Sequence, residues 1–579
     1  MRFFRITCAV GVCWLLLGTG PARAETPVDP LRLIPEQADL FLKIEKPQQL
    51  VEAVTGLELF QQLQQFAAVR ELYDSTNARR FYQLVDYFEK ELGADWPELL
   101  DRLAGDGAVL ASKIGPEPAP VLFVARAKDE KLLRQFVAVA LKVVQDELER
   151  NETGQAIRKD SYRDLPVIHF GPNAHAATAG PFLLLSNNDK ALQLGIDQYL
   201  DAKASLADVP AVAEARQLLP AAPLAWGWLN LEPLKQSPRA KEVLSLPRND
   251  ANLTVLFGSW LDVAARAPFL TTGLYKDKNG FLLTTRLPAA RDSRTAETAL
   301  HAPPAGEPGS LPLLQPKGVL VSSSYYFDVS KFWESRDQLL NEQQKQGLEQ
   351  FDANSGRFLF GNRFSDFLTQ AGPYQRFVVV HQATTGYDKQ PNQPIPAFAF
   401  VVSLRQPEKF SKSMEAVLRG AALLAGNQFK LKLNEEKRGD VNLVGYRFPE
   451  DELVRNDPTN IRYNFSPCFA TVGDQFFVAS TIELGRELIG LLEQEAQAGR
   501  KGSPATGQTR IHASGGADLL QASKSQLLAQ TILDQALNLN EAEKEVDHFI
   551  QVIRRLGMLQ LESHHGDKAF RYEVRLSVK

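Results

Sequence analysis

The sequence predicts amphipathic helices and short paired strands that do not alternate regularly along the chain. From Lys128 to Glu149, apolar residues recur with the spacing of one helical face. From Thr271 to Thr285, two strands flank the polar segment Lys276–Gly280, which predicts a hairpin whose turn takes its positive φ from Gly280. These patterns predict an α+β fold, an antiparallel or mixed sheet with helices packed on one face. Regular strand–helix alternation is absent, which argues against a Rossmann-like fold or a barrel.

Blocks of similar pattern recur in the same order in the two halves of the chain. Their shared order, more than any single match, indicates an internal duplication. The paired blocks are Ala38–Glu45 with Val319–Val329, Ala94–Gly105 with Asn362–Gly372, Val121–Val139 with Ala399–Val417, Phe182–Ser186 with Phe476–Ser480, Leu229–Leu231 with Ala517–Leu519, and Phe281–Leu287 with Phe570–Leu576. We therefore expect two similar α+β lobes, residues 25–286 and residues 319–579.

A proline-rich segment separates the two predicted lobes. Residues 287–318 contain six prolines with small residues between them. Proline lacks the backbone N–H that helices and central strands require. We expect a partly extended linker with neither a helix nor a central strand.

The first 24 residues have the three parts of a secretory signal peptide. Arg2 and Arg5 are positive, Ile6–Leu17 is an apolar core too short to span a bilayer comfortably, and Ala22–Ala24 has the small-x-small pattern that a signal peptidase cleaves. We expect a bacterial protein that is exported to the periplasm or beyond the cell, with Glu25 as its mature N-terminus.

Cleavage would change the composition in two ways. It would leave Cys468 as the single cysteine, which rules out an intramolecular disulfide. It would also lower the count of Lys and Arg from 65 to 62 against 69 Asp and Glu. A mildly acidic chain of this kind has no electrostatic reason to bind nucleic acid. No later segment has the 18 or so uninterrupted apolar residues of a transmembrane helix.

The motifs of common enzymes are absent. The chain has no Gly-x-Ser-x-Gly, Ser-x-x-Lys, His-Glu-x-x-His, Cys-x-x-Cys or phosphate-binding P-loop. Catalytic triads are assembled from distant residues, so the sequence does not exclude an enzyme, but the absence of these motifs argues against one. We assign no catalytic residue and no cofactor.

Three segments have residue types that bind metals, and we assign a metal to none of them. Glu562–Asp567 contains two histidines and two carboxylates that could bind zinc or copper, but we interpret it as a hairpin turn between the last two strands. Asp352–Gly356 lacks the regular oxygen ligands of a calcium loop, so we interpret it as a turn. His169 and His175 flank a Gly-Pro-Asn turn, and we interpret them as exposed or hydrogen-bonded histidines.

Two aromatic groups could line a ligand groove or belong to the core. Trp226 and Trp228 are two residues apart in a predicted strand and therefore share a face. The second group is Tyr325–Phe327 with Phe332 and Trp333. Core packing is the usual reason for such groups, so the binding residues stay unknown.

The mature start resembles a known group of exported bacterial proteins. Asp29–Glu45 (DPLRLIPEQADLFLKIE) has the proline, the Ala-Asp pair and the apolar strand with which those proteins begin. The likeness includes the later strand–helix repeats and so extends over most of the mature chain. The group has only domain-of-unknown-function labels, so the resemblance implies an exported α+β protein and supplies no functional residues.

Three functions are compatible with the sequence. The first is a non-catalytic exported protein that binds or interacts with a protein partner. The second is a carrier of an apolar small molecule or lipid, held in the concavity of a sheet that Trp226 and Trp228 could line. The third is a hydrolase whose site is assembled from distant residues. The absence of common enzyme motifs and the apparent duplication favour the first.

Overall fold

The computed structural model describes residues 29–64, 66–150, 157–288, 295–382, 386–451, 457, 459–566 and 568–578. The predicted signal peptide lies outside these residues. The chain forms two compact units. The first contains residues up to Ser237 with Pro268–Asp277 and Phe281–Leu287, and the second contains Pro238–Ala267, Lys278–Gly280 and the residues from Pro288 on. Pro238–Ala267 therefore belongs with the second unit, although it precedes the predicted linker.

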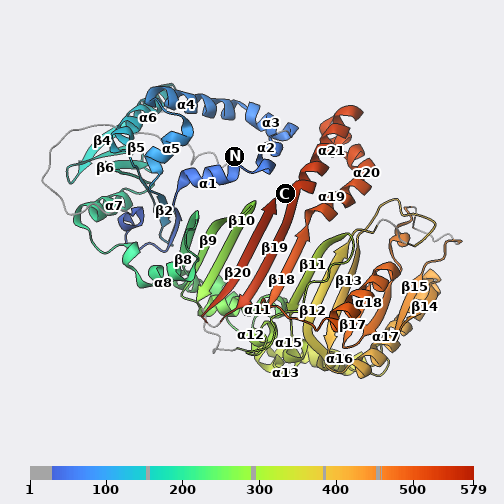
Figure 1. Ribbon diagram of the computed structural model, residues 1–579. Helices are drawn as coiled ribbons and strands as arrows, with labels where there is room; N and C mark the ends of the chain where they lie inside the picture. Colours follow the sequence, from blue (N-terminus) through green and yellow to red (C-terminus); the bar gives the residue numbers. More distant parts are fainter. Residues whose placement is uncertain are drawn as a thin grey trace. The chain divides into compact units, whose positions relative to one another are not determined.

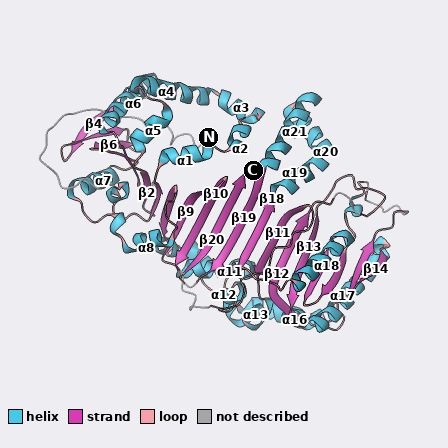
Figure 2. Cartoon of the chain, in the orientation of Figure 1, coloured by secondary structure: helices cyan, strands magenta, loops and turns pink. Residues whose placement is uncertain are grey.

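Ten strands of the described residues form the sheet of the first unit, and the pairings among β1 to β9 are antiparallel. The strands are β1 (Leu40–Ile44), β2 (Ala108–Ser112), β3 (Val121–Arg126), β4 (Ile157–Tyr162), β5 (Leu165–Phe170), β6 (His175–Ala179), β7 (Phe182–Ser186), β8 (Ala225–Asn230), β9 (Phe269–Asp277) and β10 (Gly280–Pro288). Their order across the sheet is β10-β9-β8-β1-β2-β3-β7-β6-β5-β4. Hairpins join most of the neighbours, which is why the sheet is antiparallel (Figure 2).

The helices of the first unit connect these strands. They are η3 (Pro30–Leu33), α1 (Pro47–Thr55), α2 (Glu58–Leu63), α3 (Ala67–Asp74), α4 (Thr76–Leu92), α5 (Trp96–Ala104), α6 (Glu130–Arg150), α7 (Asp189–Asp201), η4 (Leu206–Asp208), α8 (Pro210–Leu218) and α9 (Glu232–Lys235). The predicted helix over 128–149 is confirmed as α6, because its apolar stripe is strong enough to identify from the sequence.

Helices cover both faces of this sheet. On one face, η3, α7 and α8 bury the core that contains Phe41, Val109 and Leu184. On the opposite face, α6 packs over β5, β6 and β7, against Ile168 and Ala176 (Figure 1). The prediction of helices on one face is therefore wrong, because successive residues of these strands are apolar on both sides.

The second unit has a sheet of the same kind. Its strands are β11 (Val319–Tyr326), β12 (Ala371–Val380), β13 (Ala397–Leu404), β14 (Lys432–Arg438), β15 (Val441–Arg447), β16 (Cys468–Val472), β17 (Gln475–Ala479), β18 (Gly507–His512), β19 (Leu556–His565) and β20 (Ala569–Val578). They follow the order β20-β19-β18-β11-β12-β13-β17-β16-β15-β14, again antiparallel.

The helices of the second unit again lie on both faces of its sheet. They are α10 (Pro238–Leu244), α11 (Ala251–Arg266), α12 (Ala296–His301), α13 (Val329–Glu334), α14 (Arg336–Leu339), α15 (Glu342–Ser355), α16 (Phe364–Gln370), α17 (Pro407–Phe429), η5 (Ile461–Asn464), α18 (Ile482–Gln497), α19 (Ala513–Ala522), α20 (Lys524–Gln535) and α21 (Leu539–Arg555). α18 packs on the face that contains Val401 and Phe477, and α17 packs on the face that contains Phe469 and Phe476.

Strand for strand, the two orders correspond: β1 takes the place of β11, β2 that of β12, and so on to β10 and β20. One of the paired sequence blocks does not follow this correspondence. Ala517–Leu519, matched with part of β8, lies in helix α19, whereas the strand in the place of β8 is β18. A three-residue match is too short to identify a counterpart.

Two local predictions are also wrong. In the predicted hairpin, formed by β9 and β10, the positive φ belongs to Lys278 (φ 46°) and not to Gly280. The predicted linker contains helix α12, which begins after the N-cap Thr295 and ends before Pro303. The prolines flank this helix without entering it, so they do not prevent it.

Candidate functional site

The sheet of the first unit has an apolar face that is partly open to water. In the register of β1, β2 and β3, Leu42 lies opposite Leu110, and Leu110 lies opposite Phe123. Leu42 is 47% exposed and Leu110 is 45% exposed. Their neighbours along the strands, Phe41 and Val109, point to the other face and are buried.

More apolar side chains extend this surface toward β8, β9 and β10. Leu40 pairs with Leu229, and Leu229 pairs with Leu270. We call the whole set the first apolar face: Leu40, Leu42, Leu110, Phe123, Leu229, Leu270, Leu274 and Leu283. Leucines in this number on the water side of a sheet are unusual, since such positions are ordinarily polar.

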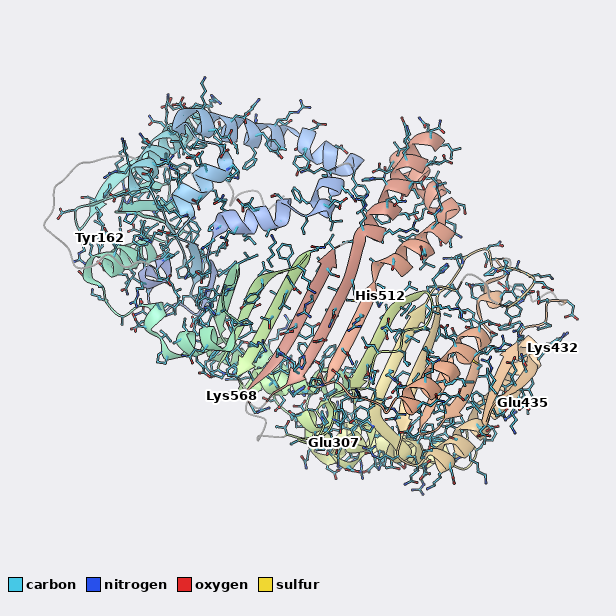
Figure 3. The ribbon with its side chains drawn as sticks, in the orientation of Figure 1. Tyr162, Glu307, Lys432, Glu435, His512 and Lys568 are labelled. Carbon is cyan, nitrogen blue, oxygen red and sulfur yellow. The ribbon has the colours of Figure 1, made fainter. Side chains whose placement is uncertain are left out.

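The second unit has an apolar face on the corresponding strands. Phe398 pairs with Val379, and Phe400 pairs with both Phe377 and Val478. Phe398 is 45% exposed. We call this set the second apolar face: Val321, Phe377, Val379, Phe398, Phe400, Val478, Ile511 and Leu559. Ile511 lies next to His512, which ends β18 and is labelled in Figure 3.

The tryptophans that the sequence suggested for a groove lie on the other side of the sheet. Trp226 and Trp228 share a face, as predicted, but both are buried in the core. Trp226 packs edge-on against Phe41, with ring centroids 4.7 Å apart, and its indole N–H donates to Glu45 Oε1 at 2.8 Å. They are core residues, and the leucines of the first apolar face lie on the opposite side.

The second aromatic group is divided among different surroundings. Tyr325 and Tyr326 point to opposite faces of β11, and Tyr326 is buried. Phe332 packs with the buried Leu300 and Leu339. Trp333 has the guanidinium of Arg336 over its ring, 4.6 Å from the centroid. These aromatics do not form one groove.

Among the described residues, Glu562–Asp567 and Asp352–Gly356 do not bring three possible metal ligands together. His564 and His565 are successive residues of β19 and therefore face opposite ways. His564 Nε2 lies 3.4 Å from Glu562 Oε2, while Thr506 Oγ1 lies 3.1 Å from His565 Nδ1. The histidines end the strand, and the turn follows them. Asp567 lies outside the described residues.

Asp352 belongs to the last turn of α15 and has a structural contact. Its Oδ1 accepts a hydrogen bond from the backbone N–H of Ser365 at 2.7 Å, which ties α15 to the start of α16. The prediction of a turn at 352–356 is wrong, because residues 352–355 are helical.

His169 and His175, by contrast, are brought together by the hairpin of β5 and β6. The two residues are direct partners in the register, and the turn between them contains Gly171 at φ 79°. Their Nδ1 atoms are 2.7 Å apart, and both side chains are buried. At this distance one Nδ1 must donate a hydrogen and the other must accept it.

A carboxylate completes this group. Asp189 is the first residue of α7, and its Oδ1 lies 3.8 Å from His169 Nδ1. Within the described part of the chain, His169, His175 and Asp189 offer ligand atoms that all lie within 4.8 Å of one another. Two imidazoles and a carboxylate are ligands that zinc accepts.

The surroundings of His175 lower its pKa. Burial is the main cause, and the neighbouring His169 ring adds to it. Asp189 and a hydrogen bond to the backbone of Pro172 oppose the shift. His175 is therefore neutral at neutral pH. The sequence contained a signal for this pair: two histidines separated by five residues with a Gly-Pro-Asn turn between them become partners if the segment forms a hairpin.

Comparisons with known proteins add little about function. No curated protein matches the chain. Crystal forms I and IV of TP0453 are 10% and 9% identical, cover 46% and 45% of this chain and 82% and 81% of their own, and both give a TM-score of 0.24. None of the described helices is both long and apolar enough to cross a bilayer. Over residues 5–258, the chain matches the family model described as "Protein of unknown function (DUF3352)", which confirms the resemblance to a family known only as a domain of unknown function.

Proposed function

We propose that this protein acts outside the cytoplasm as a non-catalytic binding protein that holds apolar chains, such as the acyl chains of a lipid, on its two apolar faces. The observation that carries the proposal is the exposure of Leu42 and Leu110 on central strands of the first sheet. Exposed leucines cost free energy in water, and covering them recovers it.

The position of these leucines favours an acyl chain over a peptide. β1 pairs with β2 and β8, and β2 pairs with β1 and β3. The backbone N–H and C=O groups of these strands are therefore used within the sheet, and a peptide strand has no edge to extend there. An acyl chain needs no hydrogen bonds, so a face that offers only side chains suits it.

The second apolar face supports the same function. Phe377 and Phe400 lie on β12 and β13, the strands that take the places of β2 and β3. The two units are in this proposal diverged copies of one ancestral lobe, and both have kept an open apolar surface on the same strands. Preservation of an apolar surface in both copies is expected if it binds a ligand.

Covering the exposed leucines and phenylalanines provides the free energy of binding. Burial of apolar surface contributes about 25 cal/mol per Å² before the entropic cost of binding. The carrier function named from the sequence is thus retained, with the leucines and phenylalanines of the apolar faces in place of the tryptophans.

Mass spectrometry and lipid-binding assays test the proposal. Protein from its own cell envelope is expected to lose a bound mass on denaturation and to bind a fluorescent fatty acid after delipidation. The double variant Leu42→Asp/Leu110→Asp should weaken that binding about tenfold or more, because it places charge where the chain lies. Phe398→Asp/Phe400→Asp tests the second face in the same way.

The matched control is Leu194→Asp. Leu194 lies on α7 and is 46% exposed, as much as the two leucines of the face, but it lies on another element. Its variant should bind like the wild type. A bare polypeptide that binds no fatty acid would reject the proposal. If the protein instead binds a protein partner, and only the variants of the apolar faces lose that partner, the function is protein interaction and not lipid binding.

A further inference from the structure

We propose that His169, His175 and Asp189 form a binding site for one divalent transition-metal ion, with zinc as the ion that best fits two imidazoles and one carboxylate. The site is in the first unit and is independent of the apolar faces. The elements that build it are the hairpin of β5 and β6 and the start of α7, so its three ligands come from well-defined backbone positions.

The distances are close to those of a metal site. Zinc bound tetrahedrally at about 2.0–2.1 Å holds its ligand atoms roughly 3.3 Å apart. The two Nδ1 atoms are now 2.7 Å apart, and His169 Nδ1 is 3.8 Å from Asp189 Oδ1. These two distances must change by only about half an ångström. All three ligand atoms lie within 4.8 Å of one another, so side-chain rotations can bring them around one ion.

A neighbouring group orients one of the ligands. Gln193 Nε2 donates to Asp189 Oδ2 at 2.8 Å, which leaves Oδ1 turned toward His169. A partner of this kind, beside a ligand of a metal site, keeps the coordinating atom directed at the ion.

Binding requires no chemistry beyond a change of tautomer. Without metal, one ring holds its hydrogen on Nδ1 and donates it to the other ring. With metal bound, both Nδ1 lone pairs coordinate the ion, and the displaced hydrogen moves to Nε2 of the same ring. The side chain of Asp189 is 43% exposed, so water can occupy a remaining coordination position from that side.

One nearby charge opposes the ion. Arg158 lies opposite His169 in the register of β4 and β5, and its Nη2 lies 3.8 Å from Asp160 Oδ2. Its positive charge lowers the affinity for a cation. Removal of that charge should therefore strengthen binding, which a merely structural role of the histidines would not predict.

Calorimetric titration of the metal-stripped, full-length mature protein with zinc chloride at pH 7.5 tests the site. We expect one zinc per chain. His169→Asn and Asp189→Asn should each weaken binding about tenfold or more, and Arg158→Gln should strengthen it several-fold. Cobalt added in place of zinc should give visible ligand-field absorption in the wild type and lose it in His169→Asn.

His564→Gln is the matched control, because it removes a histidine near a carboxylate in the other histidine-containing segment. It should bind zinc like the wild type. Failure of the wild type to bind zinc, or loss of binding in His564→Gln with retention in His169→Asn, would overturn the proposal. Circular dichroism checks that each variant is folded. If His169→Asn does not fold, the zinc affinity of Asp189→Asn, which leaves the hairpin untouched, tests the site instead.

Discussion

Arg248 and Glu297 form an ion pair in which both side chains are almost completely buried, at 1% and 3% exposure. Arg248 Nη2 lies 3.3 Å from Glu297 Oε2, and Nη1 contacts Oε1. The pair ties the segment between α10 and α11 to α12, the helix within the predicted linker. A buried charge without its partner is costly, so both residues are needed together.

Removal of one partner should destabilise the second unit strongly. Glu297→Ala leaves a buried guanidinium without its carboxylate, and we expect a loss of about 3–5 kcal/mol in the free energy of unfolding. Urea unfolding followed by fluorescence measures it. The control is Lys331→Ala, which breaks a half-exposed pair with Glu334 and should cost less than about 1 kcal/mol. Equal losses in the two variants would contradict the structure.

The same substitution should have different costs on the two faces of the first sheet. Leu122 is buried at 4% exposure, whereas Leu110 on the neighbouring strand belongs to the first apolar face. Leu122→Ala leaves a cavity and should cost about 2–5 kcal/mol. Leu110→Ala should cost less than about 1 kcal/mol, because much of that side chain is already in water. Urea unfolding of the two variants compares them directly; similar losses would mean that the face is covered.

Cys468 should be inert in the folded protein. It is buried, burial raises the pKa of its thiol, and the nearby Glu483 adds to the effect. The thiolate is the reactive form, so we expect labelling by a maleimide about a hundredfold slower in buffer than in urea. Mass spectrometry counts the label, and Cys468→Ser identifies any label on Cys8 or Cys13. Rapid labelling of Cys468 without denaturant would show that this part of the second core opens readily.

Glu562 should make the second unit sensitive to acid. Hydrogen bonding from His564 lowers the pKa of the Glu562 carboxyl to about 2, against the opposing effect of burial. A carboxyl with a lowered pKa in the folded state stabilises the fold above its unfolded pKa, and the stabilisation is lost as the pH falls toward the folded value.

Glu562→Gln should therefore remove a pH-dependent contribution between about pH 4.5 and pH 2, with an upper bound of roughly 3 kcal/mol. Thermal unfolding of the wild type and the variant across this range gives the difference. The two curves should converge toward pH 2. A constant difference across the range would show that the Glu562 carboxyl has an ordinary pKa.

Local pattern was sufficient for much of the secondary structure. Helix α6 and the hairpin of β9 and β10 were predicted from the sequence, because helical periodicity and turn residues act over a few neighbours. The same information was misleading at α12, where flanking prolines suggested an extended linker although none lies inside the helix.

Which residues meet across the chain was decided by the tertiary structure. The sequence determined that Trp226 and Trp228 share a face, since side chains alternate along a strand, but only the packing of helices decided that this face is the core and that Leu42 and Leu110 are open. The sequence also placed His169 and His175 on either side of a turn. Only the folded hairpin and the position of α7 brought the two histidines close to Asp189. Such contacts depend on strand register and helix packing between distant segments, which the local sequence does not encode.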